Sequence, residues 1–537
     1  MRRALWIVTV AMYGAANPES AITGPGLLSH IRVLASDDFG GRAPGTPGEE
    51  KTVAYLTEQC RKMGLKPGNP DGTFVQNVAL WGIRSEGTLS LSIGGKPFAM
   101  KARQDYLASS QQPVPSVSIQ DSGLVFAGYG VVAPEFHWND YKGIDVKGKT
   151  VVLLSGDPPV KDPKDSSKLD PKMFLGDALS YYGRPSTKAE TAYARGAVAV
   201  ITVFVPRNGV ANLARFAQNA PRETMILRDG ISTSRVSAQV QLAEPKAQEL
   251  FRNLGFDLNE FRARALTADF QATALQASAS FNLKNTLRQV DSANVVAKVV
   301  GSNAKLRDQY VIYSGHWDHL GTDGDKIYHG ASDNAAGAAG VLELARAFTL
   351  AKPKRSVLFL WTTAEEKGLL GALYYVKHPL YPLTHTLADI NLDYFSNWGW
   401  GRTHDISILG LGNSTLDDLV VSAAKKQGRV VTGDTDPSEG FYFRSDHLEF
   451  AKGGVPSLET TPGIDYVGKP AGYGDKVRDN YIRNDYHKTT DQVKPDWDLS
   501  GAVEDLRVLF EVGYAVSQGK GRPVFKADAP YQFAPRK

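Results

Sequence analysis

The stretch RSVLFLWTTAEEKGLLG, residues 355–371, decides the fold. Its apolar run at residues 357–363 has the length of a buried strand, and the segment from residue 367 onward has helical spacing. Two glutamates, Glu365 and Glu366, stand side by side between them. A strand that passes through a short turn into a helix is the building unit of a parallel sheet covered on both faces.

The same alternation continues on both sides of this stretch. We expect strands at ANVVAKVVG, at DQYVIYSG and at the end of THTLADINLDYF. We expect helices at NAAGAAGVLELARAFTLA and KGLLGALYYVKH. The sequence therefore predicts an α/β fold with a mostly parallel, mixed sheet that is flanked by helices.

The chain has 537 residues, which is too long for one simple core. A Pro- and Ser-rich segment, QQPVPSVSIQDSG, precedes a block of short β-rich runs with one helix near residues 187–195. We predict that residues 113–282 form a smaller, β-rich inserted domain. The main domain would comprise residues 22–112 and 283–520, and residues 521–537 would form a tail.

Composition narrows the possible functions. A net charge of +4 is too small to indicate a nucleic acid or membrane surface as partner. The chain has one cysteine, Cys60, so it cannot form an intrachain disulfide. Because Cys60 lies in a segment that looks helical, we expect its side chain to pack as a small buried hydrophobic group. Thiolate metal sites are excluded as well, so any metal must be bound by His, Asp and Glu.

The N-terminus has the three-part form of a secretory signal. Two arginines precede an apolar run at residues 4–12, and small residues follow at 14–16. We predict a signal peptide at residues 1–21 that is cleaved near Ala16 or Ala21. No later segment has 18 uninterrupted apolar residues, so we expect an exported protein, periplasmic or extracellular, without stable membrane insertion.

Residues that can bind metal follow expected strands or precede an expected helix, the places where ligand sites form in open α/β sheets. They are His316, Asp318, Asp333, Glu365, Glu366, Asp393 and, near the end of the domain, His487. Each has a simpler interpretation when taken alone. A histidine can sit in the core, Asp333 can cap a helix, and Thr363 with Glu366 has capping-box spacing. So many coincidences at strand ends are improbable together.

A shared chemistry explains the set. Two divalent ions about 3.5–4 Å apart can activate one water between them, and such a pair needs a bridging carboxylate and several His and carboxylate ligands. A further carboxylate must stay unligated to take the proton from the water. This requirement gives the adjacent glutamates separate tasks.

The combined motifs resemble the co-catalytic zinc aminopeptidases of the M28 family. The matching motifs are GHWDHLG, GASDNAAG, TAEEKG, INLD and YHKTTD, and they occur in the same order as in the family. LASDDFGGRAPGTPGEE resembles the N-terminal part of the same domain, and FAGYGV, GKTVVLL and AETAYARGAVAVI resemble the protease-associated (PA) domain that several of these enzymes carry. The resemblance implies a zinc-peptidase-like fold and two Zn²⁺ per chain.

The resemblance also implies roles for the metal-capable residues. Asp333 would bridge both zinc ions, His316 and Asp393 would complete one, and Glu366 and His487 would complete the other. The remaining carboxylates would not bind metal. Glu365 would act as general base, and Asp318 would orient the His316 imidazole.

Other positions receive less defined roles. Tyr486 matches a tyrosine that contacts the substrate carbonyl oxygen in some relatives, although ordinary packing is an equal alternative. SDHLEF resembles a family segment near the site, which would place Asp446 and His447 in the vicinity of the substrate. His319 matches none of these roles and is expected to be structural.

The implied activity is hydrolysis of peptide bonds next to a free N-terminus, with peptides or proteins as substrates. Three alternatives remain at this point. A carboxypeptidase of the same fold would need cations for the substrate carboxylate, for which Arg444 and Arg483 are candidates. A single-zinc glutaminyl cyclase and a non-enzymatic, receptor-like relative are the other two.

Overall fold

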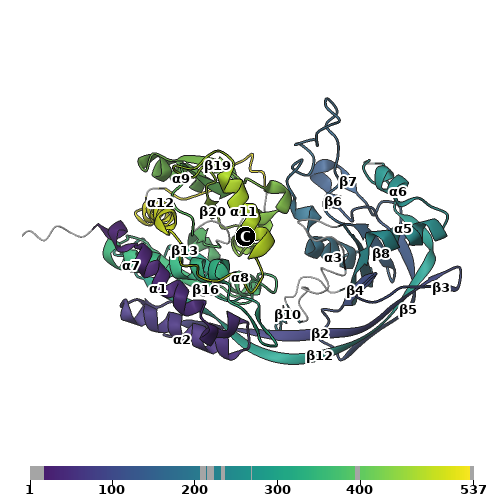
Figure 1. The fold of residues 1–537 in the computed structure, drawn as a ribbon, viewed down its shortest axis with the longest axis horizontal. Helices are drawn as coiled ribbons and strands as arrows, with labels where there is room; N and C mark the ends of the chain where they lie inside the picture. Colours follow the sequence, from purple (N-terminus) through teal and green to yellow (C-terminus); the bar gives the residue numbers. More distant parts are fainter. Residues whose placement is uncertain are drawn as a thin grey trace, which may run out of the picture.

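The computed structural model describes residues 17–205, 213, 223–230, 236–267, 269–393, 399–519 and 521–531. Two lobes share one mixed sheet of 16 strands (Figure 1). The predicted α/β fold, a mostly parallel mixed sheet with helices on its faces, is confirmed. Most of the predicted signal peptide, residues 1–16, lies outside the described residues. Among those that are described, no helix has the length and hydropathy needed to cross a membrane.

Four buried parallel strands form the centre of the first lobe: β13 (Tyr310–His316), β16 (Ser356–Thr362), β17 (Thr386–Asn391) and β20 (Ser457–Pro462). The lobe's outer strands are β18 (Asp405–Leu409) and β19 (Val430–Gly433). All four central strands run in the same direction, so their carboxyl ends meet at one edge.

Helices cover both faces of these strands, as their continuous apolar sequence requires. One face packs against α1 (Gly24–Leu34), α7 (Gly337–Ala351), α9 (Leu416–Lys426) and α12 (Ser500–Ser517). The other face packs against α8 (Leu370–Lys377) and α10 (His447–Lys452). Successive side chains point to opposite faces of a strand, so Phe359 contacts the first layer and Leu358 the second.

Two long strands connect the lobes. β2 (Val75–Ile93) pairs along its whole length with β12 (Thr273–Val299), from Val75 opposite Val295 to Ile93 opposite Ala277 (Figure 1). The predicted domain boundary between residues 282 and 283 therefore lies inside a continuous strand. A single ladder of backbone hydrogen bonds runs through both lobes.

The second lobe is built on the far halves of these strands. Its other strands are β4 (Tyr106–Ser109), β5 (Ser116–Phe126), β8 (Thr150–Leu154), β9 (Ala199–Phe204) and β11 (Ala238–Ala243). Its helices are α3 (Pro185–Tyr193), α5 (Glu244–Asn253) and α6 (Leu258–Arg264). At the centre of its core, the ring of Phe126 lies 5.2–5.9 Å from those of Phe251, Phe261 and Phe270.

A buried carboxyl group, that of Asp140, lies in the second lobe with 1% of its surface exposed. It accepts hydrogen bonds from Val131 N (2.9 Å) and from Trp138 Nε1 (2.8 Å). Burial raises the pKa of Asp140 from 3.8 to about 6, against these donors and Lys188. The folded state thus binds this proton more tightly than the unfolded chain. The resulting stabilisation is complete below about pH 4 and is lost as the pH rises through 6.

We predict that Asp140→Asn removes this pH dependence. Relative to the variant, the wild-type free energy of unfolding should fall between about pH 4 and 6, with a slope of up to about 1.4 kcal/mol per pH unit. Urea unfolding at several pH values measures the slope. The control is Asp145→Asn at a nearby exposed position, which should keep the wild-type slope. Equal slopes for Asp140→Asn and wild type would contradict the prediction.

Candidate metal centre

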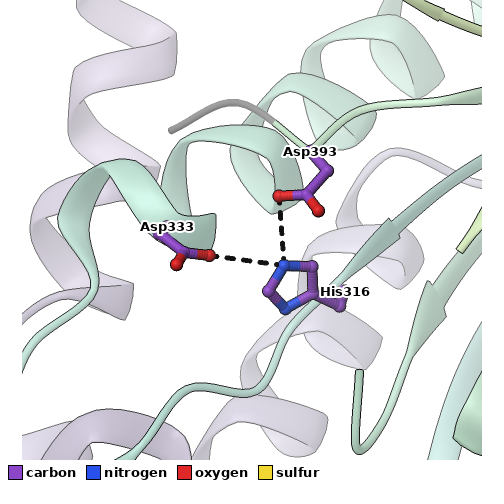
Figure 2. Close-up of side chains that lie close together, drawn as sticks. All are labelled: His316, Asp333 and Asp393. Atoms are coloured by element: carbon purple, nitrogen blue, oxygen red, sulfur yellow. Dashed lines mark hydrogen bonds and ion pairs between the residues drawn. The ribbon is translucent and has the colours of Figure 1, made fainter. Parts of the chain in front are cut away.

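The first group of metal-capable side chains lies where β13 and β17 end (Figure 2). His316 is the last residue of β13, and Asp393 follows β17. His316 Nε2 is 3.2 Å from Asp393 Oδ1 and 3.5 Å from Asp333 Oδ1. All three side chains are almost fully buried, so they form a compact group that could hold one cation.

A second group shares Asp333 with the first. Asp333 Oδ2 lies 3.1 Å from His487 Nε2, which is also 3.2 Å from Glu366 Oε2. The two oxygens of Asp333 therefore face different histidines, His316 on one side and His487 on the other. Such a placement is required of a carboxylate that bridges two cations. Asp333 is not a helix cap, because α7 begins only at Gly337 and its N-cap residue is Ala336.

His319 belongs to this second group, which the sequence interpretation missed. Its imidazole is fully buried, and Nδ1 lies 2.7 Å from Glu366 Oε1 and 4.0 Å from Asp333 Oδ2. The Glu366 contact has hydrogen-bond length, but its atoms are not aligned as in a hydrogen bond. The expectation that His319 is merely structural is therefore incomplete. Its position three residues after His316, in the same strand-end loop, was the available signal.

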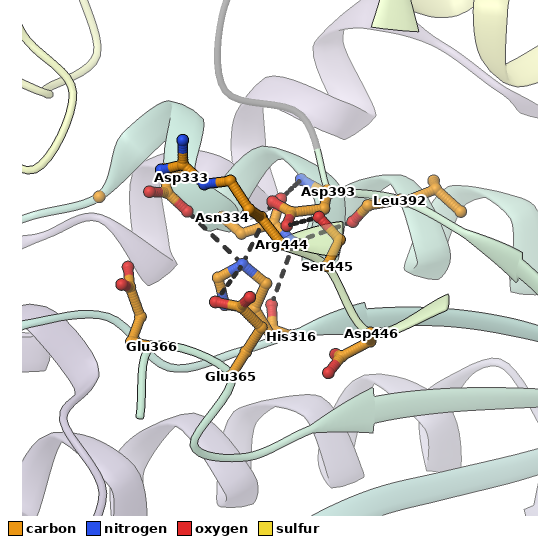
Figure 3. Close-up of polar contacts among 12 residues, drawn as sticks. His316, Asp333, Asn334, Glu365, Glu366, Leu392, Asp393, Arg444, Ser445 and Asp446 are labelled. Carbon is orange, nitrogen blue, oxygen red and sulfur yellow. Dashed lines mark hydrogen bonds and ion pairs between the residues drawn. The ribbon is translucent and has the colours of Figure 1, made fainter. Parts of the chain in front are cut away.

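The adjacent glutamates lie in different surroundings (Figure 3). Glu365 Oε2 is 3.7 Å from His316 Nε2, whereas Glu366 faces His319 and His487. Burial holds the pKa of Glu365 well above its ordinary value. Burial also acts on Glu366, but the neighbouring His487 and His319 lower the pKa of that carboxyl below its ordinary value. The carboxylate among histidines suits a ligand, and its neighbour suits a proton acceptor.

The turn that carries these glutamates is not the beginning of a helix. The capping-box interpretation of Thr363 is wrong, because the next helix, α8, begins at Leu370. The Asp318 carboxylate accepts the backbone N–H groups of Glu365 (3.0 Å) and Glu366 (3.4 Å). His316 Nδ1 lies 3.1 Å from the Asp318 carbonyl oxygen but 3.8 Å from its carboxylate. Asp318 thus orients the imidazole through its backbone and the glutamate turn through its side chain.

Asp446 and His447 lie beneath the group rather than on an open surface. Both are almost fully buried; Asp446 accepts a hydrogen bond from Thr362, and His447 Nδ1 is 2.5 Å from Glu459 Oε2. That both lie in the vicinity of the substrate stays a prediction, and their burial leaves them no open surface for direct contact. The neighbouring Ser445, to which the sequence interpretation gave no role, donates a hydrogen bond to Asp393 Oδ2 (2.5 Å).

Tyr486 stacks on the ring of His487, with centroids 4.0 Å apart. Its hydroxyl accepts a hydrogen bond of 2.8 Å from Arg444, whose side chain is exposed beside the group. Burial raises the pKa of Tyr486, so the phenol is protonated at neutral pH and can donate a hydrogen bond. Arg483, in the last turn of α11 (Tyr473–Asn484), is exposed.

The donor set fits zinc. Imidazole nitrogens and carboxylate oxygens are ordinary zinc ligands, and the residues form two candidate groups around one shared carboxylate. Glu366 Oε1 is buried without an aligned hydrogen-bond partner among the described residues. Buried carboxylates packed this closely repel one another, so cations between them would be strongly stabilised.

The fold and the two groups together define an α/β protein with a candidate site for a pair of cations. Residues 294–510 match the model of Peptidase family M28, so this segment is similar to the peptidases of that family. Aminopeptidase NAALADL1 of Mus musculus is 29% identical over 252 residues, which are 45% of this chain and 32% of that protein. A vacuolar membrane protease of Candida glabrata is 42% identical over 89 residues, 17% of this chain and 9% of that protein.

The chain thus spans about a third or less of the length of these two curated relatives. A solved structure, an aminopeptidase from Aneurinibacillus sp. strain AM-1, covers 98% of this chain and 100% of its own. Its TM-score is 0.52 and its sequence identity is 18%, so the likeness concerns the fold alone.

Proposed function

We propose that this protein is an aminopeptidase with two zinc ions per chain. The proposal rests on the position of the Asp333 carboxylate. Its Oδ1 lies 3.5 Å from His316 Nε2, and its Oδ2 lies 3.1 Å from His487 Nε2. In this proposal His316 and Asp393 complete one ion, and Glu366 and His487 complete the other. Peptides with free N-termini would be the substrates.

Bound zinc would lower the pKa of a water and polarise the scissile carbonyl. The Glu365 carboxylate accepts the proton of the attacking water and delivers it to the leaving amine. The Tyr486 hydroxyl donates a hydrogen bond to the carbonyl oxygen as negative charge develops there. Ser445 holds Asp393 in place through its 2.5 Å hydrogen bond.

The names of the aligned relatives favour aminopeptidase over the alternatives. A carboxypeptidase would need a cation for the substrate carboxylate, and the Arg444 guanidinium already binds the Tyr486 hydroxyl. A glutaminyl cyclase with one zinc would need only one of the two groups. A receptor-like relative would have no need of a proton acceptor beside the ligands.

The test is a panel of aminoacyl fluorogenic substrates with matched N-terminally blocked peptides, assayed before and after treatment with a chelator. Cleavage of free-amine substrates only, lost with the chelator and restored by zinc, is the expected result. Cleavage of the blocked peptides at similar rates, or activity that survives complete zinc removal, would contradict the proposal.

We predict that Tyr486→Phe lowers kcat by about 10²–10³ with little change in KM, as expected for loss of one oxyanion donor. The ring remains, so stacking on His487 should continue and zinc content should not change. Steady-state kinetics and elemental analysis measure the two quantities. An unchanged kcat would mean that Tyr486 only packs against His487.

Two further proposals concern the rest of the chain. Export would follow from the predicted signal, with cleavage after Ala16 rather than Ala21. Ile22 is fully buried, and the Ala21 carbonyl accepts a hydrogen bond from Arg346, so a new terminus after Ala21 would disrupt packing. N-terminal sequencing of exported protein tests this choice. The second lobe would be a PA-like domain, as its motifs imply.

A further inference from the structure

Arg42 is a fully buried arginine in the N-terminal motif LASDDFGGRAPGTPGEE, far from the metal-capable residues in sequence. We propose that it is a positioning residue that fixes the two loops carrying the metal ligands. The inference rests on the proposed zinc centre. It assigns to the N-terminal part of the chain a role in zinc affinity.

One guanidinium group joins the two loops. Arg42 Nε donates to Trp317 O (2.8 Å), in the loop between His316 and Asp318. Its Nη1 and Nη2 donate to His329 O (2.7 Å) and Gly330 O (2.9 Å), just before Asp333. A further hydrogen bond from Nη1 to Leu34 O (2.6 Å) anchors the group to the end of α1. The rigid fork of arginine can satisfy these separate carbonyls, which a lysine ammonium cannot do with the same geometry.

The backbone around Arg42 is shaped for this placement. Gly40, Gly41 and Arg42 all have positive φ. A side chain at Gly41 would collide with the carbonyl oxygens of Tyr328 and Gly321, so only glycine allows the motif to approach the second loop so closely. Arginine at positive φ is itself uncommon, and the hydrogen bonds must offset that cost.

The charge of Arg42 complements the site. Burial lowers the pKa of Arg42 to about 10, and nearby Asp491, Asp333, Asp318 and Glu366 raise it, so the group is protonated at neutral pH. A buried charge is costly unless it is paired or hydrogen-bonded, and the Arg42 guanidinium donates to four backbone carbonyls. Its positive charge also offsets part of the repulsion among the carboxylates before metal binds.

A second charged residue, Asp491, also holds the turn that carries Asp333. The Asp491 carboxylate accepts the backbone N–H groups of Ser332 (3.0 Å) and Asp333 (3.1 Å). Arg42 binds carbonyls before this turn and Asp491 binds amides within it. The bridging carboxylate is therefore fixed by two opposite charges that are not themselves metal ligands.

The chain offers a matched control in Arg355. It is also buried, with 7% of its surface exposed, and it donates to Val516 O (2.5 Å), to Gly521 O (3.0 Å) and to Gln309 Oε1 (2.8 Å). None of these partners lies in a loop with a proposed zinc ligand. Replacing Arg355 should therefore lower the stability of the protein without changing the metal centre.

The experiment compares Arg42→Met and Arg42→Lys with Arg355→Met and Arg355→Lys. Zinc affinity is measured by competition with a chelator of known affinity, and Tm is measured on the metal-free proteins. Supporting groups around a metal site are typically worth 10–100-fold in affinity, so both Arg42 variants should bind zinc about 10–100-fold more weakly. Both Arg355 variants should lower Tm but change zinc affinity less than about twofold, as expected of a remote site.

Folded Arg42→Met with wild-type zinc affinity would overturn the inference. If that variant does not fold, Arg42→Lys decides, because it keeps the charge and loses the fork; wild-type affinity in Arg42→Lys would overturn the inference equally. If the Arg42 and Arg355 variants lost zinc affinity equally, the loss would reflect lower overall stability, and this result would also overturn the inference. Failure of the wild-type protein to bind zinc would instead refute the proposed function.

Discussion

Glu365→Gln is expected to abolish most of the activity while leaving the metal centre intact. Glutamine has the shape of glutamate but cannot take the proton of the attacking water. We expect kcat to fall by on the order of 10²–10⁴, the usual contribution of a general base. Zinc content should stay at the wild-type level, because Glu365 is not a proposed ligand and is 3.7 Å from the nearest histidine nitrogen.

The matched control is Glu366→Gln, one residue further along the same turn. Glu366 Oε2 lies 3.2 Å from His487 Nε2, in the group that would hold the second ion. This variant should lose zinc as well as activity. Elemental analysis after exhaustive dialysis, combined with steady-state kinetics, separates the two outcomes. Near-normal turnover by Glu365→Gln, or loss of zinc from it, would refute its assignment as the base.

The strand-end positions of the site could be predicted from sequence. Apolar runs of strand length, each followed by a histidine or a carboxylate, are local signals, and parallel strands bring such residues together at one edge. His316 and Asp393 lie within a few ångströms of each other for this reason, and Asp333 joins them from the segment before α7. No expected strand precedes His487, so only the resemblance to a known family gives that histidine a role as ligand.

Other features depend on contacts that no local pattern encodes. Arg42 lies 275 positions before Trp317, whose carbonyl it binds. The sequence on either side of Arg42 does not indicate that contact. Thr363 shows the opposite failure, since its capping-box spacing is genuine but the turn folds onto Asp318 instead. Here the tertiary hydrogen bonds outweigh a local preference worth about 1 kcal/mol.

The domain boundary shows a third limit. A change of composition near residue 113 indicated a separate inserted unit, but β2 and β12 continue through both lobes. The local composition of a sequence indicates which residues form turns and which form strands. It does not report whether a strand stops at the edge of one core or extends into another, and β12 does extend.

Asp333→Asn should be more damaging to zinc binding than the loss of any ligand that serves one ion. An amide has one oxygen for coordination and one NH₂ group that repels a cation, so it cannot bridge. Because Asp333 contacts His316 through one oxygen and His487 through the other, the change affects both groups. We expect zinc content to fall from about two per chain to less than one, with activity lost in parallel.

Asp393→Asn is the matched control, since Asp393 lies 3.2 Å from His316 and belongs only to the first group. It should lose about one zinc and retain the other. Titration of each metal-free variant with zinc, followed by calorimetry, resolves one binding event from two. If Asp333→Asn kept both ions, the carboxylate could not be the bridge, and the two groups would have to bind their cations independently.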